Sequence, residues 1–352
     1  MPTGAIYGFM SKPEIPRNTA ADNKLLQKVL PEFLSDYFQA PCVIRRMIRR
    51  VSEYRSSFAI EVLSLELEDG TSLEIIFKNM ASGALLKDAR RFRPGFLHDP
   101  KREIDVYQKI LSRAELGTAT CYGSITDETS GRFWLFLEKV PALELYQVGD
   151  FEAWLEAARW LARMHLKFSE STGKLAREVS LLQYDRAYYG LWFERAQSFL
   201  NPHSKLARQV IRRLSKNYDR VIERLSLMPE TLLHGDFYAS NILAREYHRG
   251  FQICPIDWEM AALGPGLIDL AALTSGKWSQ QEVTSMALAY QDVLTGGNRT
   301  IGDQELFLED MVYCQIHVAL RWLGWSAQWS PPVEHHHDWL SDILRYADVI
   351  DL

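Results

Sequence analysis

The spacing of apolar residues changes near Pro141, and this change constrains the fold of the 352-residue chain more than any other feature. Before it, residues 42–80 and 121–140 consist of short apolar runs separated by polar turns, which is typical of successive strands. Alternating apolar residues on both sides of Asp69-Gly70 predict a hairpin there. The pattern therefore predicts a five-stranded antiparallel sheet in the first part of the chain.

Helical spacing of apolar residues also occurs on both sides of this sheet region. Residues 22–38 predict a helix that Pro31 interrupts, and residues 99–111 predict one long helix. After Pro141 the helices dominate, and the first of them begins with Asp150 in the N-cap position. Two more are expected over 185–199 and 204–228. We therefore expect an α+β protein with a small strand-rich lobe and a larger, mainly helical lobe.

Composition excludes several classes of protein. A net charge of −5 and a pI near 6.0 give no electrostatic footprint for nucleic acid. The four cysteines are too far apart for a zinc motif or a disulfide framework. The sequence contains neither a signal peptide nor a run of about 18 apolar residues. These features predict a cytoplasmic protein with neither a nucleic acid nor a membrane as partner, and they leave the oligomeric state open.

The segment 232–243, which reads LLHGDFYASNIL, carries the clearest chemical signal. Asp236 and Asn241 lie five residues apart between two apolar runs, and a predicted hairpin brings Asp257 back toward Asn241. A magnesium ion takes oxygen ligands and keeps several waters, so one amide and one carboxylate suffice when a phosphate supplies the rest. Asn241 and Asp257 are thus the candidate metal ligands, and Asp236 is the candidate base for a hydroxyl nucleophile.

These motifs resemble the aminoglycoside phosphotransferase and choline kinase family, which has the protein-kinase-like fold. HGDFYASN is similar to the family's catalytic loop, and IDWE at 256–259 resembles the segment that replaces Asp-Phe-Gly. GPGLIDLAAL at 264–273 and WLARMH at 160–165 also resemble family elements. The resemblance implies a bilobal fold with a nucleotide-binding lobe over 1–138, of which 1–20 is an arm or loop. Residues 139–352 then form the catalytic and substrate-binding lobe, in which Asp269 braces the catalytic loop.

The resemblance extends to the first lobe. Lys78, at the end of an apolar strand, matches the lysine that contacts the α- and β-phosphates, and Glu103 matches its ion-pair partner. Glu138 and Val140 match the hinge, whose carbonyl and amide meet the adenine edge. The loop VSEYRSSF contains no glycine, so Ser56 and Ser57 are the candidates for the phosphate loop.

The resemblance implies an ATP- and Mg²⁺-dependent small-molecule kinase that moves the γ-phosphoryl group to a hydroxyl of an aminoglycoside-, macrolide- or choline-like acceptor. Two alternatives keep the fold: a non-catalytic nucleotide-binding protein, which the missing glycines favour, and a nucleotidyl transferase. The sequence leaves open the acceptor, the choice between ATP and another nucleoside triphosphate such as GTP, and the biological role. The acidic residues of the last helices suit a cationic acceptor, with solvated charge as the alternative reading: Asp303, Glu305, Glu309, Asp310, Glu334 and Asp338.

Each candidate also has a plain structural reading. An Asp and an Asn at this spacing also occur in turns, Lys78 could end a hairpin at the surface, and Glu103 could be an exposed charge in a helix's first turn. His234 is expected to hold the loop rather than to transfer a proton. The run His335–His337 is expected in a solvated loop, because three adjacent histidines cannot all point the same way. Trp322, Trp325 and Trp329 share one helical face, which forms either core or a wall of the acceptor pocket.

Overall fold

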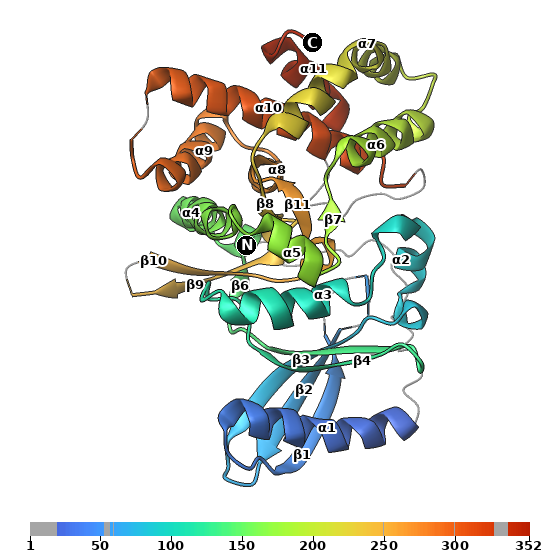
Figure 1. Cartoon of the computed structure of the whole chain (residues 1–352), viewed down its shortest axis with the longest axis vertical. Coiled ribbons are helices and arrows are strands. Elements are labelled where there is room, and N and C mark those ends of the chain that lie inside the picture. Colours follow the sequence, from blue (N-terminus) through green and yellow to red (C-terminus); the bar gives the residue numbers. More distant parts are fainter. Residues whose placement is uncertain (1–19, 53–56, 59, 249, 299, 327–336) are drawn as a thin grey trace, which may run out of the picture. The chain divides into compact units, whose positions relative to one another are not determined.

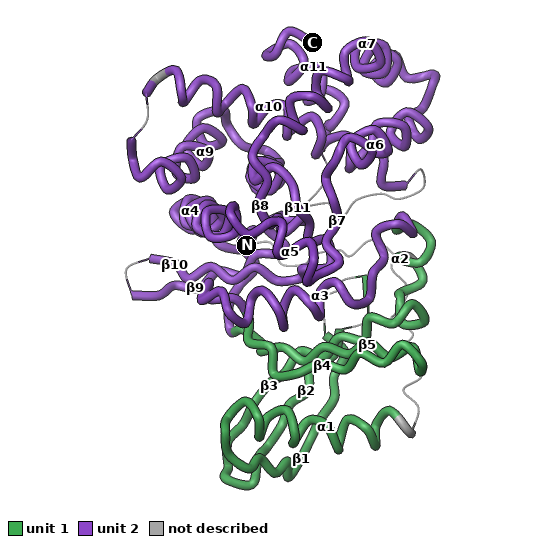
Figure 2. The backbone as a smooth tube through the Cα atoms, viewed as in Figure 1, with its two compact units in different colours: residues 1–93, 119–140, 330–334 green, residues 94–118, 141–329, 335–352 purple. Residues whose placement is uncertain are grey.

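The computed structural model forms two compact units (Figures 1 and 2). Unit 1 comprises residues 1–93, 119–140 and 330–334, and unit 2 comprises residues 94–118, 141–329 and 335–352. The structure describes residues 20–52, 57–58, 60–248, 250–298, 300–326 and 337–352. Among the described helices, none is both long and apolar enough to cross a membrane.

Unit 1 is built on a five-stranded sheet with the order β1-β2-β3-β5-β4, in which every neighbouring pair is antiparallel. This confirms the predicted sheet and the hairpin at Asp69-Gly70. The turn forms because Gly70 adopts a φ of +86° and Asp69 Oδ1 accepts a hydrogen bond from Thr71 N at 2.8 Å. The strands of this sheet are β1 (Ile44–Val51), β2 (Ile60–Leu67), β3 (Ser72–Asn79), β4 (Cys121–Asp127) and β5 (Arg132–Glu138).

Helix α1 (Ala20–Phe38) packs on one face of this sheet (Figure 1). Its fully buried Leu26, Leu30 and Leu34 recur every four residues and join a core cluster with residues of β2, β3 and β5. The predicted interruption at Pro31 is wrong, because the helix continues through this residue. The burial of the leucine stripe offsets the lost backbone hydrogen bond. The short helix α2 (Lys87–Phe92) completes unit 1.

Unit 2 is mainly helical, and one of its core clusters is rich in aromatic residues of α6, α7 and α10. The predicted helices after Pro141 are confirmed, and Asp150 caps the first by accepting a hydrogen bond from Glu152 N at 2.9 Å. The helices are α4 (Phe151–Phe168), α5 (Thr172–Glu178), α6 (Arg186–Phe199), α7 (Lys205–Leu227), α8 (Leu267–Leu273), α9 (Gln280–Thr295), α10 (Ile301–Leu323) and α11 (Trp339–Val349).

The segment predicted as one long helix over 99–111 is less regular. Helix α3 covers only Arg102–Asp105, a π-helical turn follows over Val106–Ile110, and a 3₁₀ turn covers Leu111–Arg113. The apolar face is nevertheless retained, because Ile104, Tyr107 and Ile110 are buried. Spacing thus predicted the buried face correctly but not the change of helix type.

Two small sheets in unit 2 carry the loops of the candidate site. One has the strand order β7-β11-β8 and the other has the order β10-β9-β6. The predicted hairpin after Asn241 is confirmed as β9 and β10, whose register pairs Ile242 with Pro255. Their bounds are β6 (Leu143–Glu144), β7 (Leu182–Gln183), β8 (Glu230–Leu233), β9 (Ile242–Tyr247), β10 (Gly250–Pro255) and β11 (Ala262–Pro265).

The explanation for why helix α1 continues through Pro31 can be tested by measuring the free energy of unfolding of a variant. Pro31→Ala restores a backbone donor in the middle of the helix without removing a buried leucine, so we expect it to stabilise unit 1 by about 2 kcal/mol. Urea unfolding followed by circular dichroism measures this change. Lys28→Ala, at an exposed position of the same helix, should change stability by less than about 0.5 kcal/mol. A loss of stability in Pro31→Ala would contradict the explanation.

Candidate active site

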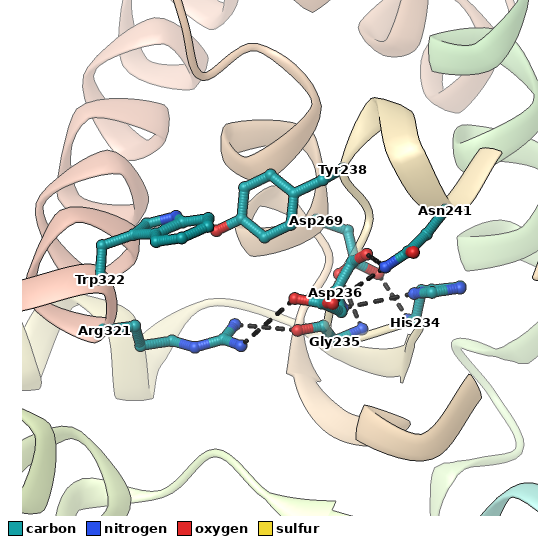
Figure 3. Close-up of polar contacts among 8 residues, drawn as sticks. All are labelled: His234, Gly235, Asp236, Tyr238, Asn241, Asp269, Arg321 and Trp322. Atoms are coloured by element: carbon teal, nitrogen blue, oxygen red, sulfur yellow. Dashed lines mark hydrogen bonds and ion pairs between the residues drawn. The ribbon is translucent and has the colours of Figure 1, made fainter. Parts of the chain in front are cut away.

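The candidate catalytic loop follows β8 and is held by a buried carboxylate (Figure 3). Asp269, which is 1% exposed, accepts hydrogen bonds from His234 N at 2.6 Å and from Gly235 N at 3.0 Å. His165 Nε2 lies 3.5 Å from the same carboxylate, and His165 Nδ1 shares a 2.7 Å hydrogen bond with the Tyr290 hydroxyl. Because hydrogen bonds to a charged group are strong, Asp269 fixes the entrance of the loop, as the sequence predicted.

Glycine is required at the second position of the loop. Gly235 has a φ of +80°, and a Cβ atom at this position would lie 2.0 Å from the carbonyl oxygen of Met260. The backbone of the loop therefore approaches the 3₁₀ turn Trp258–Met260 more closely than any other residue would permit. This contact places Asp236 beside the segment that contains Asp257.

His234 connects the loop to the end of β10. Its Nε2 lies 2.9 Å from the Ile256 carbonyl, while its Nδ1 accepts a hydrogen bond from Asp236 N at 3.3 Å. These two contacts fit the neutral ring with the proton on Nε2. The side chain is fully buried and both of its nitrogens contact the backbone, so His234 positions the loop.

Asp236 and Asn241 lie together (Figure 3). The Asn241 side-chain nitrogen donates to the backbone carbonyl of Asp236 and to its Oδ2, both at 2.9 Å. This leaves the other carboxylate oxygen, Oδ1, for a substrate, and the side chain is 37% exposed. Burial raises the pKa of Asp236 to about 6; Arg321 lowers it, and Asp257 and Glu259 raise it further. A carboxylate with such a pKa is suited to accept a proton near neutral pH.

The donor set of the candidate metal site consists of Asn241 and Asp257. Ile256 N donates to the Asn241 carbonyl at 2.9 Å, so the residue after Ile256 starts beside Asn241. Asp257 itself has a φ of 65° and a ψ of 62°, a left-handed conformation uncommon for a residue other than glycine. Since the Asn241 nitrogen binds Asp236, its Oδ1 remains for a cation. An amide oxygen and a carboxylate fit a hard divalent ion that takes further oxygens from a phosphate.

Within the described part of the chain, no three or more His, Cys, Asp or Glu residues form a metal cluster. His335 and His336 lie outside the described residues, and His337 forms an ion pair with Asp342. Trp329 also lies outside them. Helix α10 ends at Leu323, so Trp325 follows the helix instead of continuing the predicted face with Trp322. Both tryptophans are half-buried and pack against the core cluster of unit 2.

The sequence analysis missed Arg321, on α10. This arginine is 4% exposed, donates through Nη1 to the Gly235 carbonyl at 2.9 Å, and places Nη2 4.0 Å from Asp236 Oδ1 (Figure 3). The sequence signal that could have indicated it is an arginine in the mainly apolar segment 316–325. A buried cation requires a compensating group, which here is the catalytic loop.

The nucleotide candidates of unit 1 are Lys78, Ser57 and the hinge. Lys78 is 3% exposed near the end of β3, so it is not a surface lysine. Ser57 lies in the candidate phosphate loop, where its hydroxyl accepts a hydrogen bond from Arg93 at 2.8 Å. At the hinge, the Glu138 carboxylate accepts hydrogen bonds from the backbone and hydroxyl of Thr120. Val140 ends this segment of unit 1.

Two other candidates have different positions. Glu103 belongs to α3 of unit 2 and is 1% exposed, so it is not a solvated charge of a helix's first turn. Ser56 lies outside the described residues.

A strand-rich unit together with a helix-rich unit that presents this loop defines the class of protein-kinase-like α+β folds. Residues 84–301, more than half of the chain, match the model of the phosphotransferase enzyme family. The chain therefore belongs to this family and is a phosphotransferase of the small-molecule kinase type. No curated protein matches the sequence.

Solved structures show the same fold at low sequence identity. The chain is similar to a microcompartment-associated aminopropanol kinase, with 15% identity, a TM-score of 0.56, and coverage of 86% of this chain and 90% of that one. It is also similar to an amicoumacin kinase in complex with AMP-PNP, Ca²⁺ and Ami, with 14% identity and a TM-score of 0.53. That match covers 86% of this chain and 87% of the kinase. A choline/ethanolamine kinase family protein from Mesorhizobium loti has 14% identity and a TM-score of 0.51, and the match covers 82% of this chain and 85% of that one.

The raised pKa of Asp236 predicts a stability effect that needs no acceptor. A carboxyl group whose pKa is higher in the folded protein than in the unfolded chain makes folding less favourable as pH rises from the ordinary value of 3.8 to the folded value of about 6. Asp236→Asn should therefore be more stable than the wild type above pH 6, by about 1 kcal/mol after allowing for solvent screening, with little difference near pH 4. Urea unfolding between pH 4 and 8 measures this difference.

Asp303→Asn is the control with the opposite sign. The backbone N–H and hydroxyl of Thr300 lower the pKa of Asp303, so its stabilising effect is present at neutral pH and is lost on acidification. This variant should be less stable than the wild type at neutral pH. If Asp236→Asn also lost stability at pH 7.5, burial of the catalytic carboxylate would not be the cause of its raised pKa.

Proposed function

We propose that the protein transfers the γ-phosphoryl group of ATP to a hydroxyl of a small molecule, with Asp236 as the base. The observation that carries this proposal is the pairing of Asp236 with Asn241, which leaves one carboxylate oxygen for a hydroxyl and one amide oxygen for a cation. The family supplies the reaction type. The complex of a similar fold with AMP-PNP supports a nucleotide as the phosphoryl donor.

In the proposed reaction, the acceptor hydroxyl donates a hydrogen bond to Asp236 Oδ1. Its oxygen forms a bond to the γ-phosphorus while the bond from that phosphorus to the bridging oxygen breaks, ADP leaves, and the hydroxyl proton passes to Asp236. Asn241 and Asp257 would hold a magnesium ion, which when bound neutralises charge on the phosphates. Orientation by the fixed loop supplies much of the rate, because the reaction depends on positioning.

The nucleotide contacts are part of the same proposal. Lys78 binds the α- and β-phosphates, Glu103 orients it, and Ser56 and Ser57 lie along the phosphate loop. The Glu138 carbonyl and the Val140 amide bind the adenine edge. At 3% exposure the lysine and at 1% exposure the glutamate are not solvated surface charges, which favours a functional role for each. Residues 1–138 then serve the nucleotide and residues 139–352 the chemistry and the acceptor.

Loss of the base is the direct test of the reaction. Magnesium-ATP consumption is first screened against aminoglycosides, macrolides, amino alcohols, sugars and hydroxy acids. Asp236→Asn should then lower kcat at least about 100-fold, because the hydroxyl loses its proton acceptor, with ADP affinity nearly unchanged. Mass spectrometry of the product distinguishes an added phosphate from an added nucleotide. An unaltered rate would refute the role of Asp236.

The phosphate-binding role of Lys78 predicts a different kinetic change. Lys78→Met removes the charge but keeps most of the side-chain volume, so we expect KM for ATP to rise at least about tenfold. Lys24→Met is the matched control, because Lys24 is an exposed lysine of helix α1 in the same unit, outside the hinge and the phosphate loop. Equal effects of the two substitutions on KM would argue against the assignment of Lys78.

A further inference from the structure

Arg321 presents one unused edge of its guanidinium group beside the catalytic base. Its Nη1 donates to the Gly235 carbonyl, whereas Nε has no hydrogen-bond partner among the described residues and Nη2 lies 4.0 Å from Asp236 Oδ1. The Nε and Nη2 hydrogens lie on the same edge, and this edge matches the two oxygens of a carboxylate. Oδ1 is also the oxygen that Asn241 leaves free, so a bound hydroxyl would lie near this edge.

The surroundings of Arg321 are rich in polar groups that need partners. The hydroxyls of Tyr184 and Tyr188, the indole nitrogen of Trp192 and both ring nitrogens of His317 are buried without a hydrogen-bond partner within the described chain. The guanidinium carbon lies 5.9 Å from the ring of Tyr184 and 6.0 Å from that of Trp192. Most buried polar atoms in folded proteins are satisfied, so this concentration of unsatisfied groups points to a missing polar partner. With a cation at its centre, the set favours an anion.

Several of the described acidic residues of the last helices have local partners of their own. Asp303 belongs to the capping box of α10, and Asp310 pairs with Arg224 Nη2 at 2.8 Å. Asp338 caps α11, and Asp342 pairs with Arg345 at 2.7 Å and with His337. Their local partners account for these charges. An ammonium group placed at the Nε–Nη2 edge of Arg321 would meet a like charge.

Aromatic rings also lie near the base. Trp322 donates its indole N–H to the Tyr238 hydroxyl at 2.6 Å (Figure 3). Its ring stacks on that of Trp339 with centroids 5.5 Å apart. Trp322 and Trp339 are half-buried, so part of this aromatic surface remains available. Tyr238 is only two residues after Asp236. A ring or apolar group of an acceptor could therefore pack here while its hydroxyl contacts Oδ1.

We propose that the acceptor carries a carboxylate within two bonds of the reactive hydroxyl, and that the Nε–Nη2 edge of Arg321 binds this carboxylate. An apolar or ring-bearing part of the acceptor packs against Trp322 and Trp339. The proposal rests on the proposed function, since it assigns the acceptor of that reaction. It places this site among those that select hydroxy acids and against those that select cationic amino alcohols.

The test uses three probes that share a phenyl ring and a hydroxyl and differ in charge: 3-phenyllactate, 3-phenylpropane-1,2-diol and phenylalaninol. Binding is measured by tryptophan fluorescence and calorimetry without nucleotide. We expect 3-phenyllactate to bind at least about tenfold more tightly than phenylalaninol, with the diol between them. Arg321→Met should reduce this ratio to about two or less, and Arg321→Lys should retain part of it.

Arg224→Met is the matched control, because it removes an arginine that pairs with α10 away from the base, and the ratio should persist. Circular dichroism and thermal unfolding verify that each variant is folded. If Arg321→Met does not fold, the comparison is made with Arg321→Lys, which keeps the charge but lacks the Nε–Nη2 edge. The inference is overturned if phenylalaninol binds as tightly as 3-phenyllactate, if 3-phenyllactate does not bind at millimolar concentration, or if the ratio survives in Arg321→Met.

Phosphoryl transfer is scored separately by mass spectrometry with magnesium-ATP. Phosphorylation of amino alcohols that is insensitive to Arg321→Met would reject the carboxylate site and leave the proposed kinase function intact. Arg321-dependent binding of 3-phenyllactate, without ATP consumption for any hydroxyl acceptor, would support the anion site and reject the proposed reaction.

Discussion

The buried carboxylate of Asp269 is the interaction on which the candidate site depends. It accepts hydrogen bonds from two successive backbone N–H groups, those of His234 and Gly235, and so fixes the direction in which Asp236 leaves the loop. Each hydrogen bond to a charged group contributes about 1.5–3 kcal/mol, and an unpaired buried carboxylate would be strongly unfavourable. A loop conformation that lost these two hydrogen bonds would leave the buried carboxylate of Asp269 without them, so the observed conformation is favoured.

Around this fixed loop, opposing effects bring the pKa of the base into a useful range. Burial raises the pKa of Asp236 to about 6, Arg321 acts against it, and Asp257 and Glu259 act with it. The same residues have further roles in the proposal, because Asp257 would bind the metal and Arg321 the acceptor. Binding of the metal at Asp257 or of the acceptor at Arg321 would therefore also change the pKa of the base. Binding and proton transfer are thus coupled electrostatically.

Local patterns in the sequence predicted most of the fold and part of the site. The hairpin at Asp69-Gly70 and the helix that Asp150 caps depend on neighbouring residues, so their signals lie within short segments. The approach of residue 257 to Asn241 follows from the register of one hairpin. Arg321 could not be predicted in this way, because its contacts with Gly235 and Asp236 join residues about 85 positions apart and depend on how α10 packs. The continuation of α1 through Pro31 likewise depends on the sheet beneath it.

The end of the glycine-free loop of unit 1 is ordered by specific contacts. Ser57 accepts a hydrogen bond from Arg93 through its hydroxyl, and its carbonyl accepts one from Leu86 N at 3.0 Å. Phe58 is 2% exposed and forms a bridge with Leu85. A glycine at position 57 would lose the hydroxyl contact with Arg93, and a glycine at position 58 would lose the buried ring, so either would leave the end of the loop less ordered. Serine and phenylalanine therefore have structural reasons to occupy this loop, so the missing glycines do not by themselves argue against catalysis.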